Sequence, residues 1–351
     1  MSSSNVSSDL LIAPAQLNIY LGLLIYITGF IGSIGNLIVY RSRSLRIRAC
    51  SIYLFWEALV DLIYLNSVLL TRILQKGFGI SITSRSDVLC KIRQFASSYG
   101  NQLVVTFLAL ATLDRILLAQ RSTGKLKHAY RRWGNRLDLA NKLVAVFSVL
   151  WILVLWHRLV WYSASSGSCE GQSGSYAYFD NLFSAIVTCL CPMIILTVLG
   201  VLIGRSIRNI IQQQIGRVTA FSESATANQS VIHKVDAQLT IMILMQIVVA
   251  MISFLPYAAQ LLYSNITNDW SKSPLRVAWE HVISETINLL SYLLFSCPFY
   301  VTMVSFSGFR QQLLCSLGLK KQQTVNPSNT LETATGRLAK INTNAHSTVP
   351  N

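Results

Sequence analysis

Charged side chains inside otherwise apolar stretches are the residues of this sequence best placed to do chemistry. Asp114 and Arg115 close a run that carries no charge from Gln94 onward, and Glu57 and Asp61 stand one helical turn apart in another apolar run. A charge at membrane depth is costly, so such groups face protein or water and mark functional positions. The Asp114-Arg115 pair is therefore predicted to face protein or water at one membrane surface. The two neighbouring carboxylates predict that one of them carries a proton.

The elements that would hold these groups are apolar helices long enough to cross a membrane. The 351 residues have a mean hydropathy of +0.47, with 52% hydrophobic and 12% charged residues, which is too apolar for an ordinary soluble protein. Seven apolar runs have spanning length, and most lack the polar face of a soluble helix. They cover residues 17–40, 52–73, 92–118, 143–162, 179–204, 237–263 and 281–306. We therefore predict an all-α membrane protein with seven transmembrane helices.

The distribution of Lys and Arg indicates the orientation in the membrane. With the N-terminus outside, the cytoplasmic segments hold 21 of the 29 Lys and Arg residues, and the outer segments hold six. Residues 1–16 carry no Lys or Arg and form the predicted extracellular tail. No cleavable signal peptide is evident, so the first apolar run is expected to act as a signal anchor. The basic residues lie in short gaps between apolar runs, which argues against a nucleic-acid-binding face.

Two of the seven cysteines, Cys90 and Cys169, lie clearly in segments assigned to the outside. We predict that they form a disulfide in that oxidising compartment, joining the outer end of the third helix to the loop before the fifth. Asn5 and Asn265 begin glycosylation sequons in outer segments, although sequons also occur by chance. Cysteines within the apolar runs are interpreted as small buried hydrophobic residues.

The chain changes character after the seventh apolar run, which ends the predicted transmembrane domain at 17–306. Residues 307–319 place apolar side chains along one side of a short helix that would lie on the membrane surface. Cys315 in this helix is a candidate for palmitoylation, with an unmodified thiol as the alternative. Residues 320–351 are polar and rich in Ser, Thr and Asn, which predicts a disordered cytoplasmic tail.

Several residues along 17–319 keep the spacing of one family of membrane proteins. Arg115 follows Cys90 by 25 residues, and Asp114 precedes it directly. The other matching positions are Asn36, Asp61, Trp151, Pro192, Pro256, Pro298 and the pair Phe309-Arg310. Together they resemble the rhodopsin-like (class A) G-protein-coupled receptors. The resemblance implies a seven-helix bundle with a short amphipathic eighth helix, in the plasma membrane.

The resemblance also implies how such a chain would signal. Asp114 and Asp236 would hold Arg115 while the receptor is off, and the arginine would be released when helix six swings about Pro256. Bulky Phe254 and Leu255 beside that proline would transmit ligand contact into the swing of the cytoplasmic half of helix six. The implied partners are a heterotrimeric G protein, arrestin on the Ser/Thr-containing tail, and membrane lipid.

The sequence departs from the family at several motifs. Ile116 stands where the family has Tyr, Phe254 replaces the sixth-helix Trp, and the seventh-helix motif is altered around Pro298 and Tyr300. The positions that would complete a sodium site around Asp61 are poor oxygen donors. They are Val104, Leu293, Leu294 and Cys297. We therefore expect an altered activation relay and little sensitivity to sodium.

Polar residues in the outer halves of helices two, three and five to seven are the predicted ligand contacts. They are Gln75, Ser97, Ser98, Asn101, Gln102, Tyr257, Gln260, Glu280, Ser284 and Asn288. Amine receptors of the family have an Asp where this chain has Ser97, and helix seven has no lysine for a retinal Schiff base. A largely neutral, polar, aromatic-lined site suits a peptide or a small polar molecule. The general likeness is to the neuropeptide branch, such as the FMRFamide-like receptors.

Two other functions remain open. A chemosensory receptor for a small polar molecule would share the mechanism, whereas a seven-helix transporter or channel would need more ionisable groups at membrane depth. The sequence contains no evident metal-ligand cluster, phosphate loop or nucleophile–base arrangement. We therefore expect no enzyme activity, no cofactor, no metal site and no nucleic-acid partner.

Overall fold

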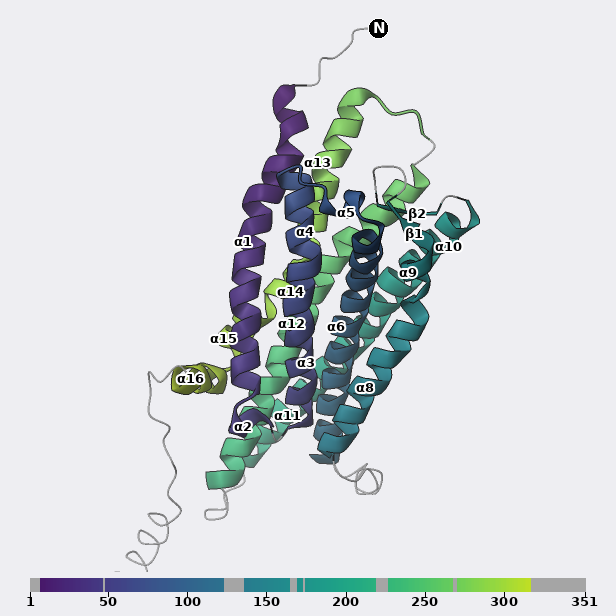
Figure 1. Ribbon diagram of the computed structural model, residues 1–351. Helices are drawn as coiled ribbons and strands as arrows, with labels where there is room; N and C mark the ends of the chain where they lie inside the picture. Colours follow the sequence, from purple (N-terminus) through teal and green to yellow (C-terminus); the bar gives the residue numbers. More distant parts are fainter. Residues whose placement is uncertain are drawn as a thin grey trace, which may run out of the picture. The chain divides into compact units, whose positions relative to one another are not determined.

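The computed structural model describes residues 7–46, 48–122, 136–164, 169–172, 174–218, 227–267 and 270–316. The chain divides into two compact units, residues 1–313 and 314–351. Most of its described residues are helical, and Figure 1 shows the long helices running side by side. A short antiparallel hairpin pairs β1 (Tyr162–Ser163) with β2 (Glu170–Gly171).

The first half of the chain forms three long helical segments joined by short ones. In order, these are α1 (Ser8–Tyr40), α2 (Arg43–Arg46), α3 (Ala49–Tyr64), η1 (Leu65–Leu69), α4 (Leu70–Arg72), η2 (Ile73–Gly77), α5 (Ile82–Arg85) and α6 (Asp87–Ser122). The elements η1 and η2 are π-helical turns that continue α3, so residues 49–77 form one helical segment.

The second half of the chain contains four further long segments. In order, its elements are α8 (Arg136–Leu155), α9 (His157–Trp161), α10 (Ser175–Phe183), the π-helical η3 (Ser184–Leu190), α11 (Cys191–Val218), α12 (Ala227–Ile266), α13 (Pro274–Ser291), α14 (Leu293–Ser296), α15 (Pro298–Ser305) and α16 (Ser307–Ser316). Sequence explains the start of α13, where Pro274 is the first helical residue and the Ser273 hydroxyl accepts a hydrogen bond from the Arg276 N–H at 3.3 Å.

Six of the described helical segments are long and apolar enough to cross a membrane, and a bent pair makes up to seven. The bent pair joins 274–296 to 298–305 at an angle of 51°. Pro298 begins its second part, and a proline there has no N–H for the preceding turn. The first helix begins at Ser8, whereas hydropathy alone predicts a start at residue 17. The described residues therefore form an essentially all-α protein suited to a multi-pass membrane topology.

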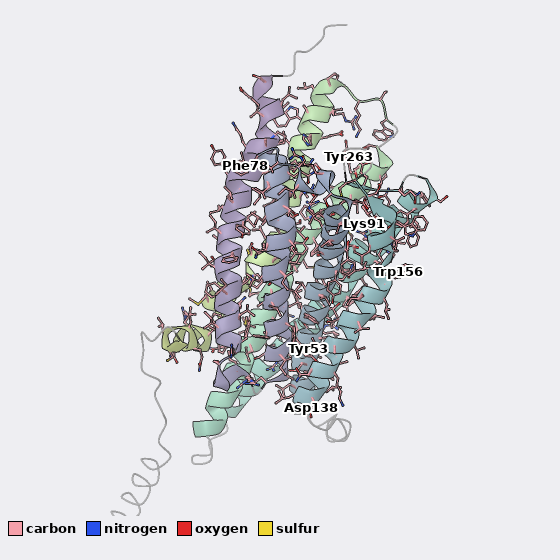
Figure 2. The ribbon with its side chains drawn as sticks, viewed as in Figure 1. Tyr53, Phe78, Lys91, Asp138, Trp156 and Tyr263 are labelled. Atoms are coloured by element: carbon pink, nitrogen blue, oxygen red, sulfur yellow. A yellow bond between two sulfur atoms is a disulfide. The ribbon has the colours of Figure 1, made fainter. Side chains whose placement is uncertain are left out.

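Large apolar side chains cover the outward faces of these helices. Leu153 and Trp156 of the α8 segment are 65% and 56% exposed, and Ile31 of α1 is 58% exposed. Figure 2 labels Trp156 at the outside of the helices, with Phe78 and Tyr263 toward one end and Asp138 toward the other. In water this much exposed apolar surface would favour aggregation, whereas in a bilayer it contacts lipid.

The close approach of α1 to the last helices depends on small residues. A methyl group in place of the Gly35 hydrogen would come within 2.4 Å of the Phe299 ring, so only glycine fits against α15 at this point. Phe299 also contacts Phe309 of α16, with ring centroids 5.8 Å apart, and Phe309 packs on Tyr40 at 5.9 Å. These contacts fix the start of α16 beside the carboxyl-terminal end of α1.

Candidate functional site

The amino-terminal end of α6 is covalently tied to the hairpin region. Cys90, on the first turn of α6, forms a disulfide with Cys169, which directly precedes β2. The two cysteines are 79 residues apart in the sequence, with Cα atoms 5.5 Å apart. This is the pair predicted from the sequence.

The carboxyl-terminal part of α6 carries a buried group of charges. Arg115 is 3% exposed, and its Nη2 donates to Asp114 Oδ2 at 3.0 Å. Asp114 Oδ1 accepts a 2.5 Å hydrogen bond from Arg136 Nη2 at the start of α8, so the carboxylate is shared by two arginines. Sequence reasoning did not find Arg136, because a run of basic residues in that segment gave no sign of which one turns inward. The side chain of Asp236, on the first turns of α12, lies outside the described residues.

The middle of the bundle contains the two predicted carboxylates. Glu57 and Asp61 lie on α3 and are both buried, and no described residue donates a hydrogen bond or an ion pair to either. A small cavity is bounded by Glu57, Leu108, Gln246, Val249, Leu294, Pro298 and Val301. Glu57 Oε2 and Gln246 Oε1 are buried there without a hydrogen-bond partner. None of the ten predicted ligand contacts lines this cavity.

The residues predicted for the helix core differ in burial and in hydrogen bonding. Trp151 of α8 donates from Nε1 to Thr106 Oγ1 of α6 at 2.9 Å, which joins these helices. Asn36 is buried on α1, and its Oδ1 has no partner among the described residues. Phe254 is buried on α12 two residues before Pro256, whereas the adjacent Leu255 is 60% exposed and faces outward. Leu255 therefore takes no part in a relay through the core.

The altered seventh-helix motif has a clear structural consequence. Tyr300 is half exposed, and its hydroxyl donates to the carbonyl of Thr28 on α1 at 3.1 Å. Its hydroxyl is therefore engaged with α1, and it does not replace the tyrosine that the family has one residue later. One residue along a helix turns the side chain by about 100°, which accounts for this difference.

The π-helical turn before Pro192 provides a contact for one of the predicted ligand residues. In π-helical register, Pro192 would bond the carbonyl of Val187, but a proline has no N–H to donate. Gln102 Nε2 of α6 donates to that carbonyl at 3.0 Å instead. Gln102 is buried and is used in this helix contact.

The other predicted ligand residues divide into paired groups near the same end. Gln260 Nε2 donates to Ser284 Oγ at 2.5 Å, which links α12 to α13, and Asn288 Nδ2 lies 3.4 Å from the same oxygen. Gln75 accepts a hydrogen bond from Thr83 at 3.2 Å. Ser98 and Asn101 are buried on α6, and Ser97 and Tyr257 are half-buried.

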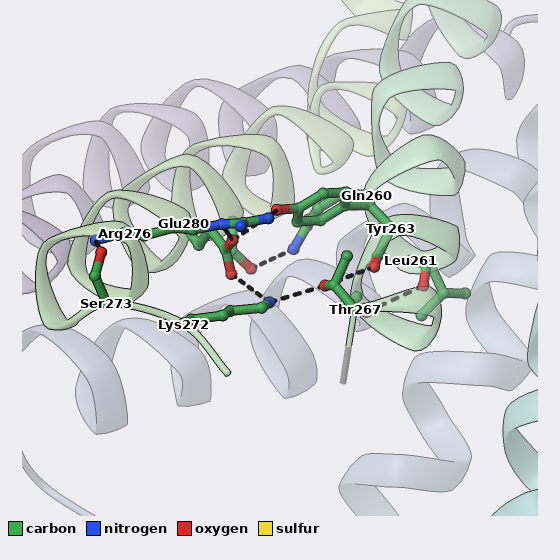
Figure 3. Close-up of polar contacts among 10 residues, drawn as sticks. Gln260, Leu261, Tyr263, Thr267, Lys272, Ser273, Arg276 and Glu280 are labelled. Carbon is green, nitrogen blue, oxygen red and sulfur yellow. Dashed lines mark hydrogen bonds and ion pairs between the residues drawn. The ribbon is translucent and has the colours of Figure 1, made fainter. Parts of the chain in front are cut away.

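Glu280 is engaged by protein groups that close the connection between α12 and α13 (Figure 3). Its carboxylate accepts from Lys272 Nζ at 2.6 Å, from Arg276 Nε at 2.8 Å and from the Tyr263 hydroxyl at 2.6 Å. Lys272 also donates to Thr267 at 2.8 Å. The network holds the end of α12 against the start of α13, and it leaves Glu280 with little capacity to bind a ligand.

A buried ion pair that was not predicted from the sequence contacts Ser98, one of the predicted ligand residues. Arg158 of α9 and Asp180 of α10 are both 6% exposed and lie 2.9 Å apart. Arg158 also donates to Ser98 Oγ on α6 and to Ser184 Oγ at 2.6 Å. The Tyr162 hydroxyl donates to Asp180 at 2.7 Å, and burial raises the pKa of Tyr162, so it stays protonated at neutral pH.

A second missed ion pair joins α1, α4 and α13. Glu285 is 5% exposed, and its Oε2 accepts from Arg72 Nη2 at 2.6 Å and from Asn18 Nδ2 at 3.0 Å. Two charged clusters therefore lie where the sequence predicts largely neutral surroundings. The sequence does not predict these ion pairs, because the local composition around a charged residue does not show which distant segment supplies the opposite charge.

The modification candidates have different surroundings. Asn5 lies outside the described residues. Asn265 is exposed near the end of α12, whereas the Thr267 hydroxyl of the same sequon is buried and donates to the carbonyl of Tyr263 at 2.9 Å. Cys315 lies in α16 as a free, half-buried thiol. Glycosylation of Asn5 and Asn265 and palmitoylation of Cys315 stay predictions.

Comparison with known proteins does not identify a family for this chain: no family model matches it, and no curated protein matches it either.

Proposed function

We propose that this chain is a rhodopsin-like G-protein-coupled receptor that binds an extracellular ligand and activates a heterotrimeric G protein. The observation that carries the proposal is the construction of α6. One end of this helix is tied by the Cys90–Cys169 disulfide, and the other end buries Arg115 against Asp114. A helix long and apolar enough to span a membrane lies between the two features.

The proposal takes the bent pair 274–305 as the seventh span and α16 as the eighth helix on the membrane surface. Six spans and one bent pair support this interpretation. The excess of Lys and Arg in alternate connections supports an extracellular N-terminus in the plasma membrane. Arrestin binding by the tail, glycosylation of Asn5 and Asn265, and palmitoylation of Cys315 belong to the same proposal.

In the proposed mechanism, the Asp114 carboxylate keeps Arg115 bound along the inner end of α6. Arg136 of α8 also donates a hydrogen bond to Asp114, so in the off state one carboxylate is shared by Arg115 and Arg136. Outward motion of the inner half of α12 about Pro256 frees Arg115 to contact the G protein. Asp236, on the first turns of α12, is the second acid proposed to hold Arg115 in the off state.

The proposed ligand is a peptide, and a small polar chemical is the alternative. The structure favours neither a channel nor a transporter, because the buried charges form separate groups. These groups are Glu57 with Asp61, Asp114 with two arginines, Arg158 with Asp180, and Arg72 with Glu285. Among the described residues no ion pair joins one group to another, whereas a conduction path needs a connected series.

The proposal is tested by screening cells that express the chain against a neuropeptide library, with sensors for a panel of Gα subunits. We expect at least one peptide to dissociate a G protein, and Arg115→Ala to abolish the response without loss of surface expression. A current or ion flux that needs no ligand, with no response from any Gα sensor, contradicts the proposal and points to a channel.

A further inference from the structure

An arginine next to the Arg72–Glu285 ion pair has no acidic partner in the part of the chain that the structure describes. Arg93 lies on the second turn of α6, and its Nε donates to Thr71 Oγ1 at 2.9 Å. No described carboxylate lies within ion-pair distance of Arg93. Its two Nη atoms have no hydrogen-bond partner in the same part of the chain, although the residue is half-buried.

The nearby acid, Glu285, forms no ion pair with Arg93 and is already paired with Arg72. Glu285 Oε2 is bound by Arg72 and Asn18, and Glu285 Oε1 lies 3.9 Å from Lys76 Nζ and 3.7 Å from His281 Nε2. Arg72, Lys76 and Arg93 together outnumber this one carboxylate. The cluster therefore has an excess of positive charge at the outer end of the bundle.

A half-buried guanidinium without a counter-charge is unfavourable, because desolvation is not repaid by an ion pair. An anion placed against the free Nη atoms would gain charge-assisted hydrogen bonds, and the planar guanidinium fits a carboxylate in a bidentate manner. Arg72 and Tyr292 lie close enough to Arg93 to act on it electrostatically. They would add a second positive charge and a hydroxyl donor to the same site.

Aromatic rings stand beside the positive charge. Tyr64 also acts electrostatically on Arg93, and its ring lies 5.9 Å from that of Tyr292 and 3.8 Å from that of Phe295, against which it stacks. Ser97, a predicted ligand contact, is four residues after Arg93 on α6 and so lies on the same face of the helix. The positive charge and the predicted ligand residues therefore share one side of α6.

We infer that Arg93 binds an anionic group of the extracellular ligand, with Arg72 and Tyr292 assisting. The ligand then belongs to the class of molecules that carry an oxyanion, such as a carboxylate, next to an apolar or aromatic body. This inference rests on the proposed function in calling the bound molecule a ligand, and it replaces the expectation of a largely neutral site.

The test uses the purified full-length protein and two small probes of the same shape. These are 3-phenylpropionate, which is an anion, and 3-phenylpropionamide, which is neutral. Melting curves over a range of probe concentrations at constant ionic strength give the affinity of each, because a ligand of the folded state raises its stability. The variants are Arg93→Gln and a matched control, Lys91→Gln, which removes a half-buried charge of the same helix that is paired with Asp87.

In the unmodified protein and in Lys91→Gln we expect the acid to bind at least about tenfold more tightly than the amide, which corresponds to about 1.4 kcal/mol. Arg93→Gln should lose this preference, and Arg93→Lys, a second variant that keeps the charge, should keep part of it. Equal affinities in the unmodified protein, no stabilisation by the acid at millimolar concentration, or a preference that survives Arg93→Gln would overturn the inference. Binding is measured without a G protein, so a failure of G-protein activation contradicts only the proposed function.

Discussion

At the scale of single residues, the carboxylates of α3 differ from the other buried charges. Asp114, Asp180 and Glu285 each have arginine partners, whereas Glu57 and Asp61 have none among the described residues. Two unpaired acids one turn apart cannot both be ionised in a low-dielectric interior without large cost. The pair is therefore a source of instability that only a proton, water or a cation can relieve.

Replacement of Glu57 by glutamine should stabilise the protein, since the amide keeps the shape of the side chain and removes one of two neighbouring acids. We expect the free energy of unfolding to rise by about 1–3 kcal/mol at neutral pH, the usual range for relieving a buried unsatisfied group. Melting of the purified protein measures this effect, with the exposed Glu170→Gln as control. A lower melting temperature for Glu57→Gln would instead mean that the carboxylate has a bound counter-ion.

At the scale of elements, buried polar contacts decide how helices are joined at the end of the bundle that carries the Cys90–Cys169 disulfide. Arg158 connects α9 to α10 through Asp180 and to α6 through Ser98. Glu280 makes a similar number of contacts between α12 and α13, but the side chains of its network are more exposed. Breaking a buried pair leaves an uncompensated charge inside the protein, whereas water replaces the partner of an exposed one.

Asp180→Asn should therefore destabilise the protein much more than Glu280→Gln. For Asp180→Asn the expected loss is about 3–5 kcal/mol of unfolding free energy, because Arg158 stays buried without a counter-charge. For Glu280→Gln the melting temperature should change little. Both are measured in the same detergent, and equal effects would contradict this assignment of the buried pair.

The helices follow from local sequence, whereas the ion pairs between side chains of different helices do not. Hydropathy predicts the positions of the spanning helices, and Pro298 marks the bend before α15. Cysteine placement predicts Cys90 with Cys169. By contrast, the partners Arg136 and Glu285 come from segments distant in sequence, and a local pattern carries no information on such pairing. The outward side chains of Leu255 and Tyr300 follow from helix rotation, which hydropathy alone leaves undetermined.

At the scale of the whole molecule, α6 connects two regions of opposite character. Its outer end bears the disulfide at Cys90 and the positively charged cluster around Arg93. Its inner end bears Asp114 between Arg115 and Arg136. In the proposed receptor, ligand binding at the first region shifts the equilibrium of the ion pairs at the second, which requires a ligand that binds the two states with different affinity.

The most direct test of this account is the rate of guanine-nucleotide exchange on a purified heterotrimeric G protein, catalysed by the protein in lipid nanodiscs without ligand. Asp114→Asn should raise the basal rate several-fold, since it removes the charge that holds Arg115 in the off state. Arg115→Gln, and the double variant with Asp114→Asn, should show no catalysis above that of empty nanodiscs. Exchange that is the same in all three variants and in the unmodified protein would contradict the claim that this ion pair controls a G protein.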